Sequence, residues 1–269
     1  MEKCSRLDRI VARVAGDDPV AFLDATTTQD FTGTSKGDSV LTCMLDEKGR
    51  VQADMRATLL DDGTVLLDAE QPARDAITGW LAKIAPLSGC EIADESEGWV
   101  VTALFGTHEQ PADTIALDSR WGASDLDVLC ARDAAFEGDE MSSPEYEAAR
   151  IVAGRPRFGV DFDGSTHIAE TPLIARAVSF TKGCYPGQES VARVHNLGHV
   201  RKRLVGLDIA RDDAPPVGGA LDVDGEVVGR ITSAARWKER VVAIAFLRSD
   251  VEDDAAVNVA GSRATVRAL

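Results

Sequence analysis

Short runs in which hydrophobic and polar residues alternate occupy most of the first half of the chain. Alternation with a period of two is typical of strands that bury one face. The pattern predicts strands over residues 7–16, 39–45, 50–60, 64–70, 99–105 and 125–131. The second and third of these are joined by Asp46-Glu47-Lys48-Gly49, which predicts a hairpin turn.

Helical periodicity interrupts these strands at a few places. Asp18 followed by Pro19 predicts a short helix that ends near Ala25. Residues 71–87 space their apolar positions as an amphipathic helix does. Ser143-Pro144-Glu145 supplies an N-cap, a proline at the first helical position and an acid in the first turn, and this helix is expected to end at Gly154.

The pattern changes at about residue 204, where only short strands follow. Five of them in about 65 residues, with Asp224-Gly225 as one of the turns, predict a small antiparallel barrel. The predicted architecture is therefore α+β followed by an all-β module.

Composition narrows the function classes. Hydrophobic residues make up 44% of the 269 residues, so a sizeable core is expected. No apolar run approaches the roughly 20 residues that span a bilayer, and the N-terminus lacks the apolar region of a signal peptide, so we expect a cytoplasmic protein. A net charge of −16 argues against nucleic acid and membrane surfaces as partners.

Five scattered cysteines and four histidines show neither a disulfide framework nor the spacing of a metal site, so no metal is expected. The charge is also uneven, because residues 171–206 form a basic island. It holds six cations against the single acid Glu189: Arg176, Lys182, Arg193, Arg201, Lys202 and Arg203. Such an island is a candidate site for a carboxylate or phosphate, and the alternative is a solvated basic face.

Cys184 lies in an unusual setting for a cysteine, between Lys182 and the turn Tyr185-Pro186-Gly187. The thiolate is the reactive form of cysteine, and neighbouring cations and helix N-termini favour it. Both features are expected here, because residues 188–193 have helix-forming character. Cys184 could act as a nucleophile, as a redox-sensitive group or as a soft ligand shared with a second protein. The alternative is a cysteine that is packed in a tight loop.

Residues 182–189, K-G-C-Y-P-G-Q-E, resemble the K-G-C-Y-x-G-Q-E signature of YgfZ-type folate-binding proteins. These are relatives of the aminomethyltransferase (T-protein) of the glycine cleavage system. The segment 146–163 is similar to the helix, loop and strand that precede the signature in the family. LDEKGRVQADMR resembles the family's K-G-R hairpin, and VAGDDPVAFLDATTTQDF resembles its opening segment.

This resemblance implies a three-domain fold of the GcvT/YgfZ type. Two ferredoxin-like α+β domains and a C-terminal β-barrel would surround a central folate channel. The implied domains are residues 1–45 together with 132–203, which carry the cysteine loop, then 46–131, and finally the barrel at 204–269.

The resemblance also implies tetrahydrofolate, or a reduced one-carbon derivative of it, as the ligand. A pterin presents an N–H and an amino group side by side, which one carboxylate can bind, and Glu170 matches the position where T-proteins place such a glutamate. Tyr146 lies where YgfZ-type proteins offer a ring to the folate. The remaining cofactor-binding candidates are Tyr185 and the cations Arg193, Arg201 and Arg203, which would hold the glutamyl carboxylates.

Three functions are compatible with these residues. The resemblance to YgfZ implies a folate-dependent accessory protein in iron–sulfur cluster assembly or repair, with iron–sulfur proteins as partners and Cys184 and Lys182 as its reactive pair. The alternative is a folate-dependent aminomethyltransferase, in which Asp54 would act. T-proteins carry two consecutive acids at this point, and here Ala53 replaces one of them. The third possibility is a folate-binding module without chemistry of its own.

Overall fold

The computed structural model describes residues 3–106, 109–117, 125–134, 139–198 and 200–269, which form two compact units. Unit 1 comprises Met1–Met141 and Ala175–Ala192, and unit 2 comprises Ser142–Ile174 and Arg193–Leu269. The three domain boundaries expected from the sequence, and the central channel, stay predictions.

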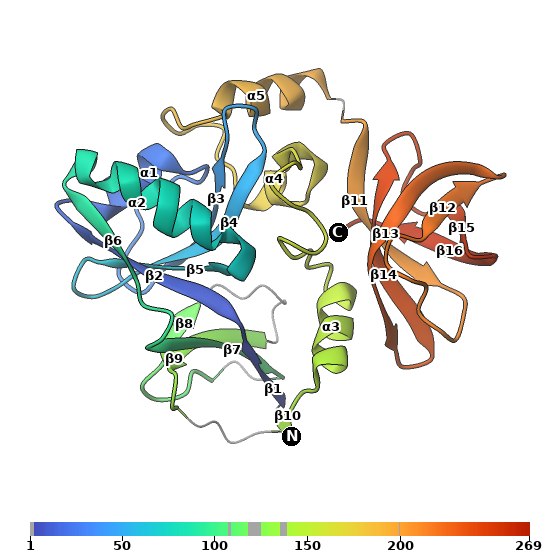
Figure 1. Ribbon diagram of the computed structural model, residues 1–269, viewed down its shortest axis with the longest axis horizontal. Coiled ribbons are helices and arrows are strands. Elements are labelled where there is room, and N and C mark those ends of the chain that lie inside the picture. Colours follow the sequence, from blue (N-terminus) through green and yellow to red (C-terminus); the bar gives the residue numbers. More distant parts are fainter. Residues whose placement is uncertain (1–2, 107–108, 118–124, 135–138, 199) are drawn as a thin grey trace. The chain divides into compact units, whose positions relative to one another are not determined.

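One sheet of unit 1 has five antiparallel strands in the order β3-β4-β5-β2-β6 (Figure 1). Its strands are β2 (Arg9–Gly16), β3 (Ser39–Leu45), β4 (Val51–Leu59), β5 (Val65–Glu70) and β6 (Cys90–Asp94). β3 and β4 form the predicted hairpin. Its turn is fixed by the Asp46 carboxylate, which accepts hydrogen bonds of 2.9 Å from the backbone N–H groups of Lys48 and Arg50.

The second sheet of unit 1 has the order β10-β1-β7-β9-β8. Its strands are β1 (Lys3–Leu7), β7 (Trp99–Phe105), β8 (Ile115–Leu117), β9 (Asp125–Ala131) and β10 (Asp139–Glu140). An apolar cluster joins the two sheets, with Val11 and Leu66 from the first and Val101 and Leu129 from the second. Charge joins them as well, because the buried Arg56 guanidinium on β4 binds Asp68 on β5 and Asp127 on β9.

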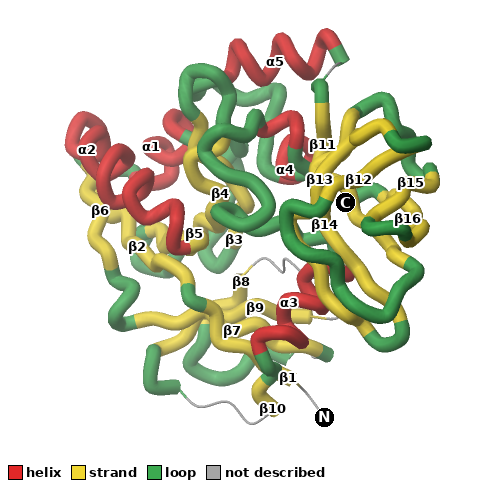
Figure 2. Tube along the Cα trace, turned by 45° about the vertical axis from the view of Figure 1, so that its right-hand side comes forward, coloured by secondary structure: helices red, strands yellow, loops and turns green. Residues whose placement is uncertain are grey.

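The helices of unit 1 begin where the sequence predicts. α1 spans Pro19–Thr26, and the Asp18 carboxylate accepts a hydrogen bond of 2.9 Å from the N–H of Ala21. The amphipathic segment after β5 is helical from Gln71 to Ser88 but irregular. It consists of a 3₁₀ turn (Gln71–Ala73), a π-helical stretch (Asp75–Leu81), α2 (Ala82–Ile84) and a second 3₁₀ turn (Ala85–Ser88). Figure 2 shows α2 beside β6, and Ile77 and Leu81 are completely buried.

Unit 2 begins with α3 (Ser143–Val152). Its N-cap is Ser142 rather than the predicted Ser143, because the Ser142 hydroxyl and the Glu145 side chain form a capping box. The segment that follows is held by the buried Asp161 carboxylate, which accepts hydrogen bonds from Arg150, Thr232 and Ser233. The short helix α4 (Leu173–Arg176) and α5 (Gln188–Leu197) lie at the boundaries between the units.

The C-terminal strands close into the predicted barrel, with the order β11-β14-β13-β12-β15-β16. They are β11 (Lys202–Ile209), β12 (Ala220–Val223), β13 (Glu226–Trp237), β14 (Arg240–Arg248), β15 (Ala256–Val259) and β16 (Ser262–Arg267). The barrel has six strands rather than five, because the last predicted strand is divided by a turn. Ala260 and Gly261 have φ values of 47° and 80° there. The α+β architecture with a closed barrel is thereby confirmed.

Candidate functional site

Cys184 lies at the exposed tip of the loop that connects Ser179 to α5. Gly183 on one side of it is exposed too, whereas Tyr185 on the other side is 7% exposed. Beyond the tip the chain turns sharply, and the N–H of Gln188 donates a hydrogen bond of 3.2 Å to the carbonyl of Tyr185. The exposed thiol is therefore followed directly by a buried tyrosine, which anchors one side of the tip.

Gly187 holds the far side of the loop against the β3–β4 hairpin. Its φ is 84°, and a Cβ at this position would overlap the carbonyl oxygen of Asp46 and lie 3.3 Å from Leu45 Cβ. A few residues later, the Ser190 hydroxyl donates a hydrogen bond of 2.9 Å to the carbonyl of Lys48. The hairpin and the cysteine loop, which the sequence shows as two separate motifs, thus contact each other directly.

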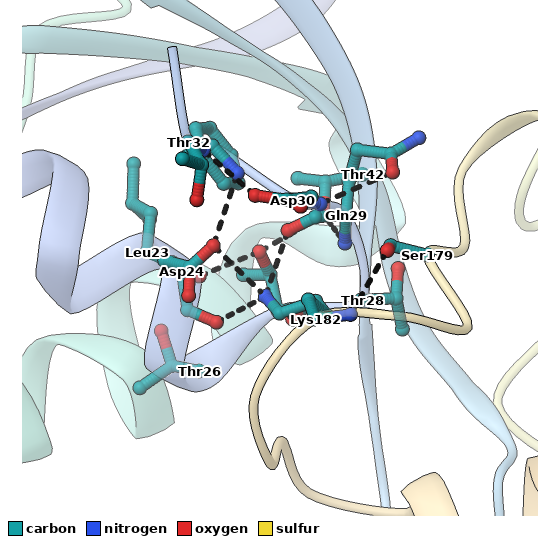
Figure 3. Close-up of polar contacts among 12 residues, drawn as sticks. Leu23, Asp24, Thr26, Thr28, Gln29, Asp30, Thr32, Thr42, Ser179 and Lys182 are labelled. Carbon is teal, nitrogen blue, oxygen red and sulfur yellow. Dashed lines mark hydrogen bonds and ion pairs between the residues drawn. The ribbon is translucent and has the colours of Figure 1, made fainter. Parts of the chain in front are cut away.

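Lys182 holds the near side of the loop, and Figure 3 shows how. Its ammonium donates hydrogen bonds to the backbone carbonyls of Asp24, Thr27 (3.0 Å) and Gln29 (2.7 Å). One carboxylate oxygen of Asp24 lies 3.3 Å away, and the lysine side chain is 1% exposed. Burial lowers the pKa of Lys182, and the Asp24 carboxylate opposes that shift.

Tyr185 packs inward from the tip. The Lys182 ammonium lies 5.6 Å from the centre of its ring. Burial, together with the neighbouring Cys43, raises the pKa of the Tyr185 hydroxyl to about 12. Tyr185 was expected to bind the cofactor, and with 7% exposure its ring offers little surface to a ligand in this arrangement.

Asp54, the third candidate for chemistry, lies on β4 opposite Cys43 and is 1% exposed. Burial lowers the pKa of the Arg9 guanidinium, but the carboxylates of Asp68, Glu70 and, to the smallest extent, Asp54 raise it above its ordinary value. Ala53 beside it is completely buried. This position is therefore part of a buried network of charges in unit 1.

Glu170 lies in unit 2, at the end of the 3₁₀ turn Ile168–Glu170. Its side chain is 17% exposed, and the Lys202 ammonium lies 3.8 Å from one carboxylate oxygen. Burial raises the pKa of Glu170, and Lys202 opposes the shift. Glu170 lines a cavity of about 190 Å³ that Arg203 and Leu204 also line.

The cations of the basic island differ in their surroundings. Arg203 is engaged, because it lies 2.9 Å from a carboxylate oxygen of Asp253 and donates to the carbonyl of Val251. Arg193 and Arg201 are exposed, and within the described residues their guanidinium groups have no hydrogen-bond or ion-pair partner. Tyr146, on α3, is half-buried. Two guanidinium groups without a partner among the described residues therefore remain available to a ligand with several carboxylates.

Within the part of the chain that the structure describes, no group of three or more histidine, cysteine, aspartate or glutamate side chains is placed to hold a metal ion. Among the same residues, no helix combines the length and the apolar character that a membrane crossing requires.

Comparison with known proteins identifies what this arrangement resembles. Residues 9–112 match the model of the GCVT N-terminal domain. The solved structure of the glycine cleavage system aminomethyltransferase T from Bartonella henselae superposes with a TM-score of 0.85, at 17% sequence identity, over 100% of this chain and 85% of that one. The chain has a GcvT-like fold.

Two curated relatives extend the comparison. The chain is 27% identical to an iron-sulfur cluster assembly factor, the mitochondrial IBA57 homolog of Mycosarcoma maydis, over 80% of this chain and 59% of that protein. It is 26% identical to the tRNA-modifying protein YgfZ of Hamiltonella defensa, over 93% of this chain and 84% of the relative. The chain is thus similar to proteins of the GcvT-like/YgfZ type. It spans about three fifths of the length of the first relative.

Proposed function

We propose that this protein binds tetrahydrofolate and acts as an accessory factor in iron–sulfur cluster assembly or repair. The observation that carries the proposal is the anchored loop, which presents the exposed Cys184 on a GcvT-like fold. The relatives support the same role, since one is named an iron–sulfur cluster assembly factor and another is named a YgfZ protein. The partners would be folate and iron–sulfur clients or assembly proteins, in the cytoplasm.

The residues of unit 2 fit a reduced folate. A pterin needs a carboxylate that can accept from two neighbouring donors, and Glu170 offers one in the wall of a cavity. The Lys202 ammonium is 3.8 Å from this carboxylate, beyond the usual length of a hydrogen bond. The exposed Arg193 and Arg201 would suit the carboxylates of the glutamyl tail, and the half-buried Tyr146 would supply a ring for stacking.

An aminomethyltransferase is the second candidate, and the structural likeness to aminomethyltransferase T favours it. Asp54 would be its acid. However, Asp54 is 1% exposed, and the neighbouring position is alanine. A carboxylate in this environment is poorly placed to reach a substrate, and we therefore prefer the accessory role.

The test has two parts that separate binding from activity. Calorimetric titration with tetrahydrofolate should show binding, and Glu170→Ala should weaken it by about 1–3 kcal/mol, because the pterin donors lose their acceptor. Cys184→Ala should keep the folate affinity and abolish the support of iron–sulfur enzymes in a deletion strain. Unchanged affinity in Glu170→Ala removes Glu170 from the site, and full complementation by Cys184→Ala contradicts the accessory role of the thiol.

A further inference from the structure

The Lys182 ammonium has three N–H groups, and three backbone carbonyls accept from it. Those carbonyls belong to Asp24, Thr27 and Gln29. The distance from Lys182 Nζ to the carbonyl oxygen is 3.0 Å at Thr27 and 2.7 Å at Gln29. With its three donors used in this way, one Asp24 carboxylate oxygen 3.3 Å away and 1% of the side chain exposed, the ammonium is satisfied within residues 24–29. None of these contacts involves the Cys184 side chain.

The carbonyls that bind Lys182 lie at the C-terminal end of α1 and just beyond it. The last carbonyls of a helix lack partners inside the helix, and a cation there is stabilised by the helix dipole. The same stretch binds the loop at two more points. The Thr28 hydroxyl donates to the carbonyl of Ala177 (2.5 Å), and the N–H of Ser179 donates to the carbonyl of Thr28 (2.9 Å). Lys182 is thus the last in a row of contacts that fasten residues 177–182 to residues 24–29.

The other side of the tip is fastened independently. Tyr185 is buried and Gly187 lies against Asp46 of the hairpin, so the two exposed residues Gly183 and Cys184 bridge two fixed points. A bridge of this length has few conformations available, because both of its ends are held.

We propose that Lys182 is a positioning residue that fixes the Cys184 loop through the backbone of residues 24–29, rather than a cation that activates the thiol. Whether the positioning of the loop by Lys182 matters for activity rests on the proposed role of Cys184. The positioning itself is independent of that role, since it concerns only contacts within unit 1. Removing a well-hydrated ammonium from water is unfavourable unless its donors are satisfied. The carbonyls compensate for that cost only while the loop stays in place.

Two readouts on Lys182→Met separate positioning from activation. The first is amide hydrogen exchange of residues 24–29 and 179–187. The second is the pH midpoint of Cys184 alkylation by iodoacetamide, measured in a Cys4→Ser background because Cys4 is half-buried while Cys43, Cys90 and Cys130 are buried. We expect exchange in both segments to accelerate about tenfold or more, since the opened loop loses its protection, while the pH midpoint stays within 0.3 of the parent value.

Lys182→Arg is the matched variant, because it keeps the charge and changes the shape of the donor group. Positioning predicts that arginine fails to restore protection, since a planar guanidinium cannot direct three donors as an ammonium does. Activation predicts that arginine preserves the pH midpoint and that methionine raises it. A midpoint raised in Lys182→Met, with or without loss of protection, or protection that is unchanged in both variants, would overturn the inference.

Ser179→Ala provides a milder test should either lysine variant fail to fold. It removes the acceptor of two hydrogen bonds of 3.3 Å, from the N–H groups of Thr181 and Lys182. Exchange at 179–187 should accelerate about threefold without a lower melting temperature, and unchanged exchange would overturn the inference. Neither readout contains folate or an iron–sulfur protein. Failure of the proposed function is therefore distinguishable from failure of this inference.

Discussion

The Cys184 loop and the Glu170 turn are both functional candidates, but the protein holds them in opposite ways. In the loop, the charged group is buried and its donors are met by three carbonyls. In the turn, the carboxylate is partly buried with a cation 3.8 Å away, and burial raises its pKa. A buried charge whose donors are all met stabilises the local conformation, whereas a partly buried carboxylate beside a cavity can still bind a ligand. The first arrangement suits presentation of a group, and the second suits binding.

The largest expected effect comes from disturbing the satisfied region at its glycine. Gly187→Ala should destabilise the protein by about 1–3 kcal/mol, because φ is 84° and the added Cβ would overlap the Asp46 carbonyl. Gly183→Ala is the matched control in the same loop, because nothing lies within 4 Å of its added Cβ. Urea unfolding of both variants measures the difference. Equal stabilities would mean that the contact with the hairpin is unimportant.

A smaller effect is expected at the free cations of unit 2. The double variant Arg193→Ala/Arg201→Ala should bind tetrahydrofolate triglutamate about three- to tenfold more weakly and the monoglutamate almost unchanged, since exposed charge pairs are worth up to about 1 kcal/mol each. Binding of the triglutamate should also fall more steeply with salt. Arg263→Ala, an exposed arginine of the barrel, is the control. If the binding of both folates depends equally on salt, the basic island does not bind the glutamyl tail.

Glu170→Gln tests whether the carboxylate is held at a cost in stability. Because the folded pKa of Glu170 is raised, the folded protein binds more protons than the unfolded chain at pH values near and just above 4.5. Ionisation of Glu170 therefore lowers the free energy of unfolding as pH rises through the pKa of Glu170 in the folded protein. The glutamine variant should melt higher than the parent at pH 7, and this difference should shrink below pH 4. A lower melting temperature at pH 7 would show that the pair with Lys202 dominates instead.

The smallest effect is spectroscopic. The chain has two tyrosines, so Tyr146→Phe leaves Tyr185 as the only phenol. Its absorbance at 295 nm should titrate near the pKa of about 12, because a buried hydroxyl beside Cys43 resists ionisation. Lys182→Met should bring the midpoint closer to the ordinary value of 10.0 if the loop opens. A midpoint near 10 in the parent would contradict the burial of Tyr185.

The sequence predicts the elements well where the period is strong, and less well where an element is short or irregular. The β3–β4 hairpin, α1 and the barrel follow from alternation and capping. β1, β6, β8 and β10 were not predicted. β1 has five residues, and β8 and β10 have only three and two. β6 follows a helical segment whose π-helical stretch no simple period describes.

The limits of sequence are clearest at the site. Lys182 stands two residues from Cys184, and this spacing suggested a cation acting on the thiol. Spacing cannot show where a four-carbon side chain ends, and here it ends 153 to 158 residues away along the chain. The contact between Gly187 and the hairpin was also invisible, although a glycine beside a tight turn was a signal of close approach. The sequence likewise does not show which cations of the basic island are already paired, as Arg203 is with Asp253.

The row of contacts between residues 24–29 and 177–182 has a consequence for the order in which the chain is made. Unit 1 is completed only by Ala175–Ala192, which are synthesised after β1 to β10 and after the first part of unit 2. A nascent or truncated chain that ends before residue 175 has both sheets of unit 1 but not the segment that presents the thiol. A single cut in the chain therefore cannot release an intact unit 1. The loop that carries Cys184 can be fixed in place only late in synthesis.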